Sequence, residues 1–174
     1  MIPAAPIGQL VTGLKGRMIA VLYRPSEKTD IAGMARIRAR EWGELEYWKK
    51  RISRYLDGDL SPQLALAPRA CHIAEAESSI VGFVAGHLTR RYGCDGELEW
   101  INVIPERRNS GLASELLRLL AGWFVQQGAF RICIDVEPSN TAARAFYSRH
   151  GAKRLNKHWL AWNDISGVLG KHRS

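Results

Sequence analysis

The segment that most constrains the fold joins the end of a strand to the start of a helix through a short loop. It spans residues 103–113 and reads VIPERRNSGLA. Pro105 stops the strand, and the apolar spacing that follows Gly111 is that of an amphipathic helix. Backbone N–H groups at a helix start lack intrahelical acceptors and lie at the positive end of the helix dipole. The segment therefore predicts an anion site, suited to a diphosphate, with Arg107 and Arg108 adding positive charge at its edge.

The chain length and composition fit a single globular domain around this segment. There are 174 residues, 46% of them apolar, which is about one domain with enough apolar surface for a core. Residues 1–17 contain glycines and prolines without a sustained hydrophobic period, so we expect a loosely ordered N-terminal extension there and one domain over residues 18–174. The net charge of +8 favours anionic partners.

Other sequence features indicate the cellular setting. No apolar stretch approaches the roughly 20 residues that cross a bilayer, and the N-terminus is apolar first and basic afterwards, the reverse of a signal peptide. The cysteines, Cys71, Cys94 and Cys133, are odd in number and widely spaced, which favours free thiols in a reducing compartment. We therefore expect a cytoplasmic protein without membrane contact, and no metal site, because the histidines and cysteines show no ligand spacing.

The hydrophobic periods predict the element order β-α-α-β-β-β-α-β-α-β. Strands are expected at about residues 18–23, 71–76, 80–88, 97–103, 131–136 and 155–162. Helices are expected from residues 26–30 to about 37, and at about 44–56, 110–127 and 140–150. The three strands in series between the second and third helices are most simply an antiparallel meander.

A second informative segment covers residues 136–151 and reads VEPSNTAARAFYSRHG. Asn140 is placed to cap its helix, and Tyr147 follows two turns later. The two segments, at this separation and in this strand–helix order, resemble the coenzyme-binding motifs of the GNAT superfamily of acetyl-CoA-dependent N-acetyltransferases. The resemblance extends to Ile80-Val-Gly-Phe and to the opening strand and helix, so it covers about residues 18–162.

This resemblance implies a fold and a set of coenzyme contacts. The fold is of the α/β (α+β) class, with a mixed, mostly antiparallel central sheet and helices on both faces. Acetyl-CoA is the implied co-substrate: its pantetheine arm would lie between two splayed strands, and the backbone N–H groups of residues 108–114 would surround its diphosphate. The residues implied in coenzyme binding are Ile101, Val103, Arg108, Asn109, Ser110, Gly111, Leu112, Ala113, Ser114, Asn140 and Ala143.

The chemistry of acetyl transfer asks for a base and an acid at the same place. An ammonium group must lose a proton before it attacks a thioester, and a carboxylate can accept that proton. Glu99 is the leading candidate, since in a regular strand it shares a face with Ile101 and Val103. A bulge in this strand would reverse that parity, so Glu97 is held as the alternative. Tyr147 matches the family tyrosine placed near the coenzyme sulfur, where it can protonate the leaving thiolate.

The function that follows is transfer of an acetyl group from acetyl-CoA to a primary amine, directly, in a ternary complex. The acceptor is a small molecule or a protein amine, and the excess positive charge favours an acidic or neutral one. The alternative is a non-catalytic acyl-CoA-sensing or nucleic-acid-binding module, although no nucleic-acid motif accompanies the positive charge. Either a monomer or a homodimer is compatible with the composition.

Overall fold

The computed structural model describes residues 6–12 and 18–170, whose helices and strands follow the predicted order with two additions. The strands are β1 (Ile7–Thr12), β2 (Met18–Pro25), β3 (Ala65–Ala76), β4 (Ser79–Thr89), β5 (Gly96–Val103), β6 (Ile132–Asp135), β7 (Lys153–Arg154) and β8 (Trp159–Trp162). The α-helices are α1 (Ile31–Ala39), α2 (Leu45–Asp57), α3 (Leu112–Gln126) and α4 (Thr141–Arg149).

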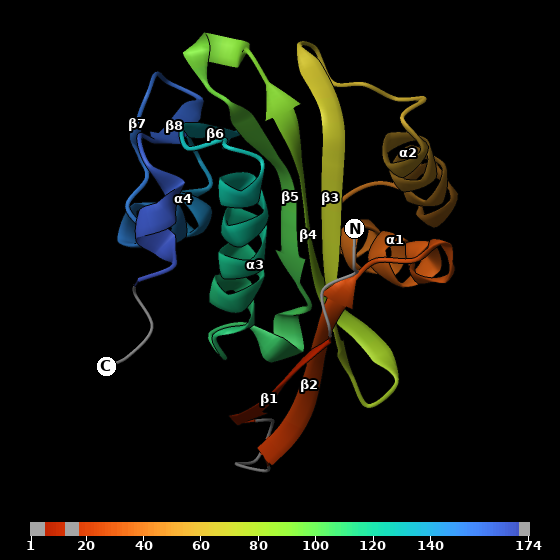
Figure 1. The fold of residues 1–174 in the computed structure, drawn as a ribbon. Coiled ribbons are helices and arrows are strands. Elements are labelled where there is room, and N and C mark those ends of the chain that lie inside the picture. The colour runs from red at the N-terminus through yellow and green to blue at the C-terminus, as the bar shows by residue number, and fades with distance from the viewer. Residues whose placement is uncertain (1–5, 13–17, 171–174) are drawn as a thin grey trace.

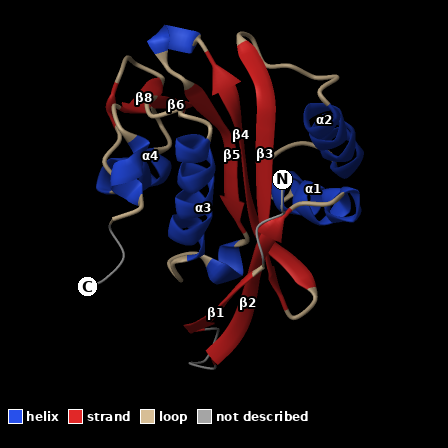
Figure 2. Cartoon of the chain, in the orientation of Figure 1, coloured by secondary structure: helices blue, strands red, loops and turns tan. Residues whose placement is uncertain are grey.

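One sheet of eight strands, in the order β1-β2-β3-β4-β5-β6-β8-β7, lies between two helical layers. Figure 1 shows α1 and α2 on one side of the strands and α3 and α4 on the other, and Figure 2 marks the same layers by element type. All neighbouring strands are antiparallel except β5 and β6, which are parallel. The predicted mixed, mostly antiparallel sheet with helices on both faces is confirmed. None of the described helices is long and apolar enough to cross a membrane.

The first addition to the predicted order is β1, which falls within the expected N-terminal extension. It runs antiparallel to β2, from Ile7 opposite Tyr23 to Thr12 opposite Met18. Because β1 is an edge strand with exposed apolar side chains, its sequence lacks the in–out alternation that marks a strand. The predicted element order is therefore corrected by one additional strand, β1, before the first predicted strand. Residues 1–5 and 13–17 lie outside the described residues, and the domain boundary at residue 18 stays a prediction.

The second addition is β7, which precedes the last predicted strand and forms a short hairpin with β8, the second half of that strand. The amide of Leu155 donates to the carbonyl of Trp159 at 2.9 Å. The side chain of Asn156 accepts from the amides of His158 and Trp159, both at 3.0 Å, and closes the turn. The earlier helices and strands agree with their predicted positions to within a few residues, apart from β3, which begins six residues earlier than expected.

Two hydrophobic cores lie on the two faces of the sheet. On one face, the apolar stripe of α3 packs on the strands, with Leu116, Leu120 and Phe124 buried. On the other face, α1 and α2 bury Met34 and Ile52, among others, against Phe83 and Trp100. The two cores fix both helical layers to the sheet.

The strands β5 and β6 separate soon after they meet. They pair at Gly96 with Ile132 and at Glu97 with Cys133, and not beyond. The remaining part of β5 pairs with β4 alone. Its other edge therefore offers backbone N–H and C=O groups to a ligand, as the splayed strands of the prediction require.

A β-bulge lies in β5 at Glu99. Ala85 pairs with Trp100 and Gly86 pairs with Leu98, so Glu99 is the extra residue between them. Consequently Leu98 packs in the core beneath α3, whereas Trp100 packs beneath α1 and α2.

The bulge overturns the face predicted for Glu99. The Glu99 carboxylate lies 4.0 Å from the guanidinium of Arg51 on α2, whereas Ile101 and Val103 pack on the α3 side. The expectation that Glu99 shares a face with Ile101 and Val103 is therefore wrong. The cause is a bulge in this strand, the case for which Glu97 was held as the alternative. Glu97 contacts His87 and Arg91.

Candidate functional site

Two adjoining cavities open where β5 and β6 part. The first, of about 690 Å³, is bordered by the loop that precedes α3 and is called here the loop cavity. The second, of about 580 Å³, is bordered by Glu97 and Glu99 and is called the carboxylate cavity. The residues that border both are Glu41, Ile101, Asn102, Asn140, Ala143 and Tyr147. A ligand could therefore extend from one cavity into the other past Tyr147.

The start of α3 leaves a run of backbone amides without partners. Gly111 caps the helix with φ +86°, and Asn109 also has a positive φ of 59°. In the described part of the chain, the amides of residues 109–114 make no backbone hydrogen bond. A Cβ on Gly111 would meet no protein atom within 4 Å, so the space beside these amides is open. The loop can thus approach an anion closely, as its sequence predicts.

The arginines near this loop are largely engaged by protein groups. The amide of Arg108 donates to the carbonyl of Pro105 at 3.2 Å, and its guanidinium pairs with Glu41. The guanidinium of Arg107 pairs with Glu77 at 3.1 Å and is nearly buried. The Arg108 amide therefore does not belong to the predicted run of free N–H groups, which begins at residue 109.

Two residues predicted to bind coenzyme differ from the others in where their side chains lie. Leu112 is buried in the core beneath α3 and presents only its amide to the loop. The hydroxyl of Ser110 donates to the carbonyl of Arg107 and stabilises the loop. The remaining predicted residues border the loop cavity, namely Ile101, Val103, Arg108, Asn109, Gly111, Ala113, Ser114, Asn140 and Ala143.

Helix α4 forms the opposite wall of the loop cavity. The side chain of Asn140 accepts from the amide of Ala143 at 3.1 Å, so the predicted helix cap is confirmed. One ring nitrogen of His150 lies 3.0 Å from the hydroxyl of Ser114, which ties the end of α4 to the first turn of α3. The two helices are thereby held at a fixed spacing across the cavity.

Tyr147 lies where the two cavities meet. It is 5% exposed, and its ring packs edge-on against Trp162 with 5.8 Å between ring centroids. Burial raises the pKa of its hydroxyl above the usual value, so this group stays protonated at neutral pH. A protonated hydroxyl at this junction can donate a proton to either cavity.

The carboxylate cavity holds the two candidate bases in different states. Glu97 is buried and accepts a hydrogen bond at 3.0 Å from Nε of Arg91. Glu99 makes no hydrogen bond within the described residues, and its nearest cation is Arg51 at 4.0 Å. Burial, assisted by the charge of Glu97, raises the pKa of the Glu99 carboxyl. Glu99 therefore holds a proton more tightly than a solvated carboxyl group does.

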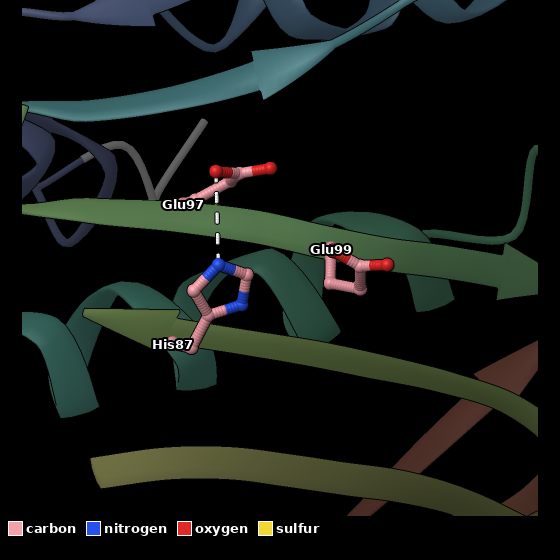
Figure 3. Close-up of side chains that lie close together, drawn as sticks. All are labelled: His87, Glu97 and Glu99. Atoms are coloured by element: carbon pink, nitrogen blue, oxygen red, sulfur yellow. Dashed lines mark ion pairs between the residues drawn. The ribbon is translucent and has the colours of Figure 1, made fainter. Parts of the chain in front are cut away.

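A third titratable side chain, His87, lies beside these carboxylates, as Figure 3 shows. His87 is fully buried on β4 directly opposite Glu97, and its Nε2 lies 3.6 Å from Oε2 of Glu97. The side-chain nitrogen and oxygen atoms of His87, Glu97 and Glu99 that face one another lie within 4.8 Å. The guanidinium of Arg91 pairs with Glu97 at 3.0 Å, so one carboxylate of this cluster already has a cation beside it.

Sequence reasoning did not identify His87. The histidines were considered only as metal ligands, for which they lack the spacing along the chain. The pairing of His87 with Glu97 follows from the β4–β5 register, and the bulge at Glu99 changes that register by one residue. The available signal was Gly86 within an apolar strand, since an isolated glycine in a strand often marks a bulge.

Comparisons with known proteins identify a matching family model and related sequences. Residues 33–152 match the family model described as Acetyltransferase (GNAT) family. An aminoglycoside N(6')-acetyltransferase type 1 of Salmonella typhimurium is 30% identical over 94 residues, which are 51% of this chain and 65% of that protein. An L-2,4-diaminobutyric acid acetyltransferase of Nocardia farcinica is 28% identical over 137 residues, covering 75% of this chain and 70% of that protein.

The structural comparison extends the fold match along most of the chain. The PaiA N-acetyltransferase of Thermoplasma acidophilum, crystallised in complex with coenzyme A, superposes with a TM-score of 0.58. The two share 17% sequence identity, and the match covers 83% of this chain and 98% of that one. At this identity the match describes the fold.

Proposed function

The chain belongs to the GNAT family of acetyltransferases, and on that premise we propose that it transfers an acetyl group from acetyl-CoA directly to a primary amine. The observation that carries the proposal is the junction of two cavities at Tyr147. Among the described residues, one cavity has a run of amides without backbone partners, and the other has a largely buried carboxylate, Glu99, that makes no hydrogen bond. This arrangement separates a place for an anionic donor from a place for a cationic acceptor.

Three features of the loop cavity fit coenzyme A. The free amides of residues 109–114 suit a diphosphate, and the open space at Gly111 allows it to approach. The unpaired edge of β5, near Ile101 and Val103, suits the amide groups of a pantetheine arm. Bound there, acetyl-CoA would supply a thioester as the acetyl donor.

The protein groups then have separate roles in proton transfer. Glu99 would accept a proton from the acceptor ammonium, since its raised pKa makes it a better base than a solvated carboxylate. Tyr147 would donate a proton to the thiolate that leaves. Glu97, whose carboxylate is engaged by Arg91 at 3.0 Å, is better suited to support its neighbour.

Direct transfer in a ternary complex is favoured over a covalent acyl-enzyme. Cys71, Cys94 and Cys133 are all buried free thiols. None of them borders either cavity of the described residues. A thiol acting as nucleophile needs an accessible position and a lowered pKa near the donor, and the cavities offer no such cysteine.

The carboxylate cavity favours an acceptor with positive charge. The carboxylates that border it are Glu41, Glu97, Glu99, Asp135 and Glu137, against the two guanidinium groups of Arg38 and Arg91. Burial, together with the charges of Glu137 and Glu97, raises the pKa of Asp135 against the opposing charges of His158 and Arg91. An acceptor with an ammonium group beside the reacting amine would neutralise the carboxylates of this cavity better than the acidic or neutral acceptor expected from the net charge.

The proposal is tested by free-thiol release from acetyl-CoA across a panel of amines. The panel contains a diamino acid, an aminoglycoside, a linear polyamine and a peptide with a free N-terminus. We expect thiol release that requires at least one of these amines, and that falls in the Glu99→Gln and Tyr147→Phe variants. Coenzyme binding without amine-dependent thiol release would instead favour the non-catalytic alternative.

A further inference from the structure

The imidazole of His87 is held by Tyr55 in one orientation. The hydroxyl of Tyr55, on α2, lies 2.9 Å from Nδ1 of His87, and both side chains are fully buried. If neutral His87 carried its hydrogen on Nδ1, the Tyr55 hydroxyl hydrogen would have no acceptor among the described residues. The neutral ring therefore accepts from Tyr55 at Nδ1 and carries its hydrogen on Nε2. A protonated ring would carry that hydrogen on Nε2 as well.

The Nε2–H group of His87 is directed at the carboxylates but has no hydrogen-bond partner. The nearest oxygen, Oε2 of Glu97, is 3.6 Å away, and it already accepts from Arg91 at 3.0 Å. Nε2 is among the buried polar atoms that make no hydrogen bond in the described chain. A buried donor without an acceptor is unfavourable, so a nearby carboxylate that can move toward it will be drawn to it.

Glu99 is the carboxylate free to respond. It is the extra residue of the bulge, it makes no hydrogen bond within the described chain, and one of its carboxylate oxygens lies within 4.8 Å of a ring nitrogen of His87. Its side chain is 11% exposed, at the wall of the carboxylate cavity. A small rotation would bring an oxygen of Glu99 toward Nε2–H and leave the other oxygen facing the cavity.

We propose that His87, with its ring fixed by Tyr55, is a positioning residue that orients the Glu99 carboxylate and stabilises its ionised form for proton abstraction. The inference rests on the proposed function in that Glu99 is taken as the base for the acceptor amine. His87 does not touch the substrate; it acts through Glu99. Burial makes Glu99 a stronger base but also favours its neutral form. His87 favours the ionised form, so Glu99 can still be ionised when the amine binds.

The charged and titratable groups around Glu99 come from each neighbouring element. Arg38 on α1 and Arg51 on α2 favour the ionised carboxylate, as does His87 on β4. Glu97 on β5 and burial favour the neutral form. Both arginines remain when His87 is replaced, so the change in the Glu99 pKa reports the loss of the imidazole, with its charge and its Nε2–H group. A lost hydrogen bond to the ionised form raises the pKa of a carboxyl, here by about one unit.

The test measures the Glu99 pKa directly by NMR titration of protein labelled with ¹³C at the glutamate carboxyl carbons. The Glu99 signal is identified by its loss in Glu99→Gln. We expect His87→Phe to raise the Glu99 pKa by about one unit, and His87→Gln, whose amide can still donate, to raise it less. Tyr55→Phe should also raise it, because the ring is then free to carry its hydrogen on Nδ1. His72→Phe is the matched control, since His72 is a histidine of the same sheet whose pKa is shifted by burial alone.

Each outcome decides the inference. A Glu99 pKa that stays at its wild-type value in His87→Phe and Tyr55→Phe overturns it, as does an equal rise in His72→Phe. If His87→Phe does not fold, His87→Gln and Tyr55→Phe carry the same comparison. Where an amine is acetylated, the acid limb of the kcat/KM profile should move upward by the same amount, whereas a purely structural role would lower activity at every pH. If no amine is acetylated, the proposed function fails, yet the titration still decides the role of His87.

Discussion

Gly111 provides the sharpest test of the loop cavity, because a methyl group added there meets no protein atom. Its φ is +86°, in the left-handed region, and an alanine Cβ would have nothing within 4 Å. The cost to stability in Gly111→Ala is therefore conformational alone, roughly 1–2 kcal/mol. For a chain of this length that lowers Tm by roughly 2–8 °C.

The chain offers a matched control at Gly128, just beyond α3. This glycine also has a positive φ, +71°, and open space where a Cβ would lie. Gly128→Ala should therefore lose about as much stability as Gly111→Ala, measured by thermal unfolding of both variants. Gly128 borders neither cavity, so only Gly111→Ala should lose affinity for coenzyme A.

The expected loss of affinity follows from the amides around the Gly111 position. A methyl group there occupies the approach to residues 109–114, and relief of the strained φ moves these amides. We expect coenzyme A to bind at least about tenfold more weakly, which is about 1.4 kcal/mol. Isothermal titration calorimetry at one fixed salt concentration gives the comparison. Equal coenzyme affinities in the two alanine variants would refute the assignment of the diphosphate to this loop.

Three further perturbations test the site and the sheet. Tyr147→Phe should lower kcat by roughly 10²-fold while coenzyme affinity in calorimetry stays near wild type, and an unchanged kcat would remove Tyr147 as the acid. Glu99→Gln should abolish the acid limb of the pH–rate profile. Glu99→Gln should also increase the free energy of unfolding at neutral pH. A carboxyl whose pKa is raised by folding destabilises the folded state at pH values above its unfolded pKa, and the substitution removes this carboxyl. Equal denaturant midpoints for Glu99→Gln and the wild-type protein would contradict this. Gly96→Ala, whose Cβ would lie 2.4 Å from Phe124, should lose roughly 1–3 kcal/mol in denaturant unfolding. Gly122→Ala, in mid-helix, adds only an ordinary contact to Leu169 at 4.0 Å and should gain up to about 1 kcal/mol.

The sequence predicts the fold well where hydrophobic periods are strong. The stripe of α3 and the pattern of α2 are long and regular, and both helices begin and end within two residues of their predicted limits. The prediction fails at the edges of the sheet, where β1 and β7 make few core contacts and need no apolar pattern. Strand pairing there depends on backbone hydrogen bonds, which every residue except proline can make.

Some features of the site depend on residues that are neighbours in the sequence, and others depend on how strands pair. The start of α3 and the cap at Asn140 depend on neighbouring residues, so the sequence predicts both. The orientation of Glu99 depends on the bulge, and the position of His87 depends on the register of two strands. Such information becomes visible only when β4 and β5 are aligned, because a shift of one residue moves every side chain to the other face.

The glycines of β4 and β5 explain why the bulge and the parting of the strands occur together. A Cβ on Gly86 would lie 2.9 Å from the carbonyl oxygen of Glu97 and 3.0 Å from Phe124, so the backbones of β4 and β5 approach closely there. Gly96 admits the same Phe124 ring from the other strand. Phe124 packs between Gly86 and Gly96, so α3 lies close to the sheet where β5 still pairs with β6. The bulge residue, Glu99, comes three residues after Gly96 in β5. The helix that presents the coenzyme loop and the strand that presents the base are therefore positioned by one packing contact. For this reason we expect a larger residue at Gly96 or Gly86 to disturb coenzyme binding and the Glu99 pKa together.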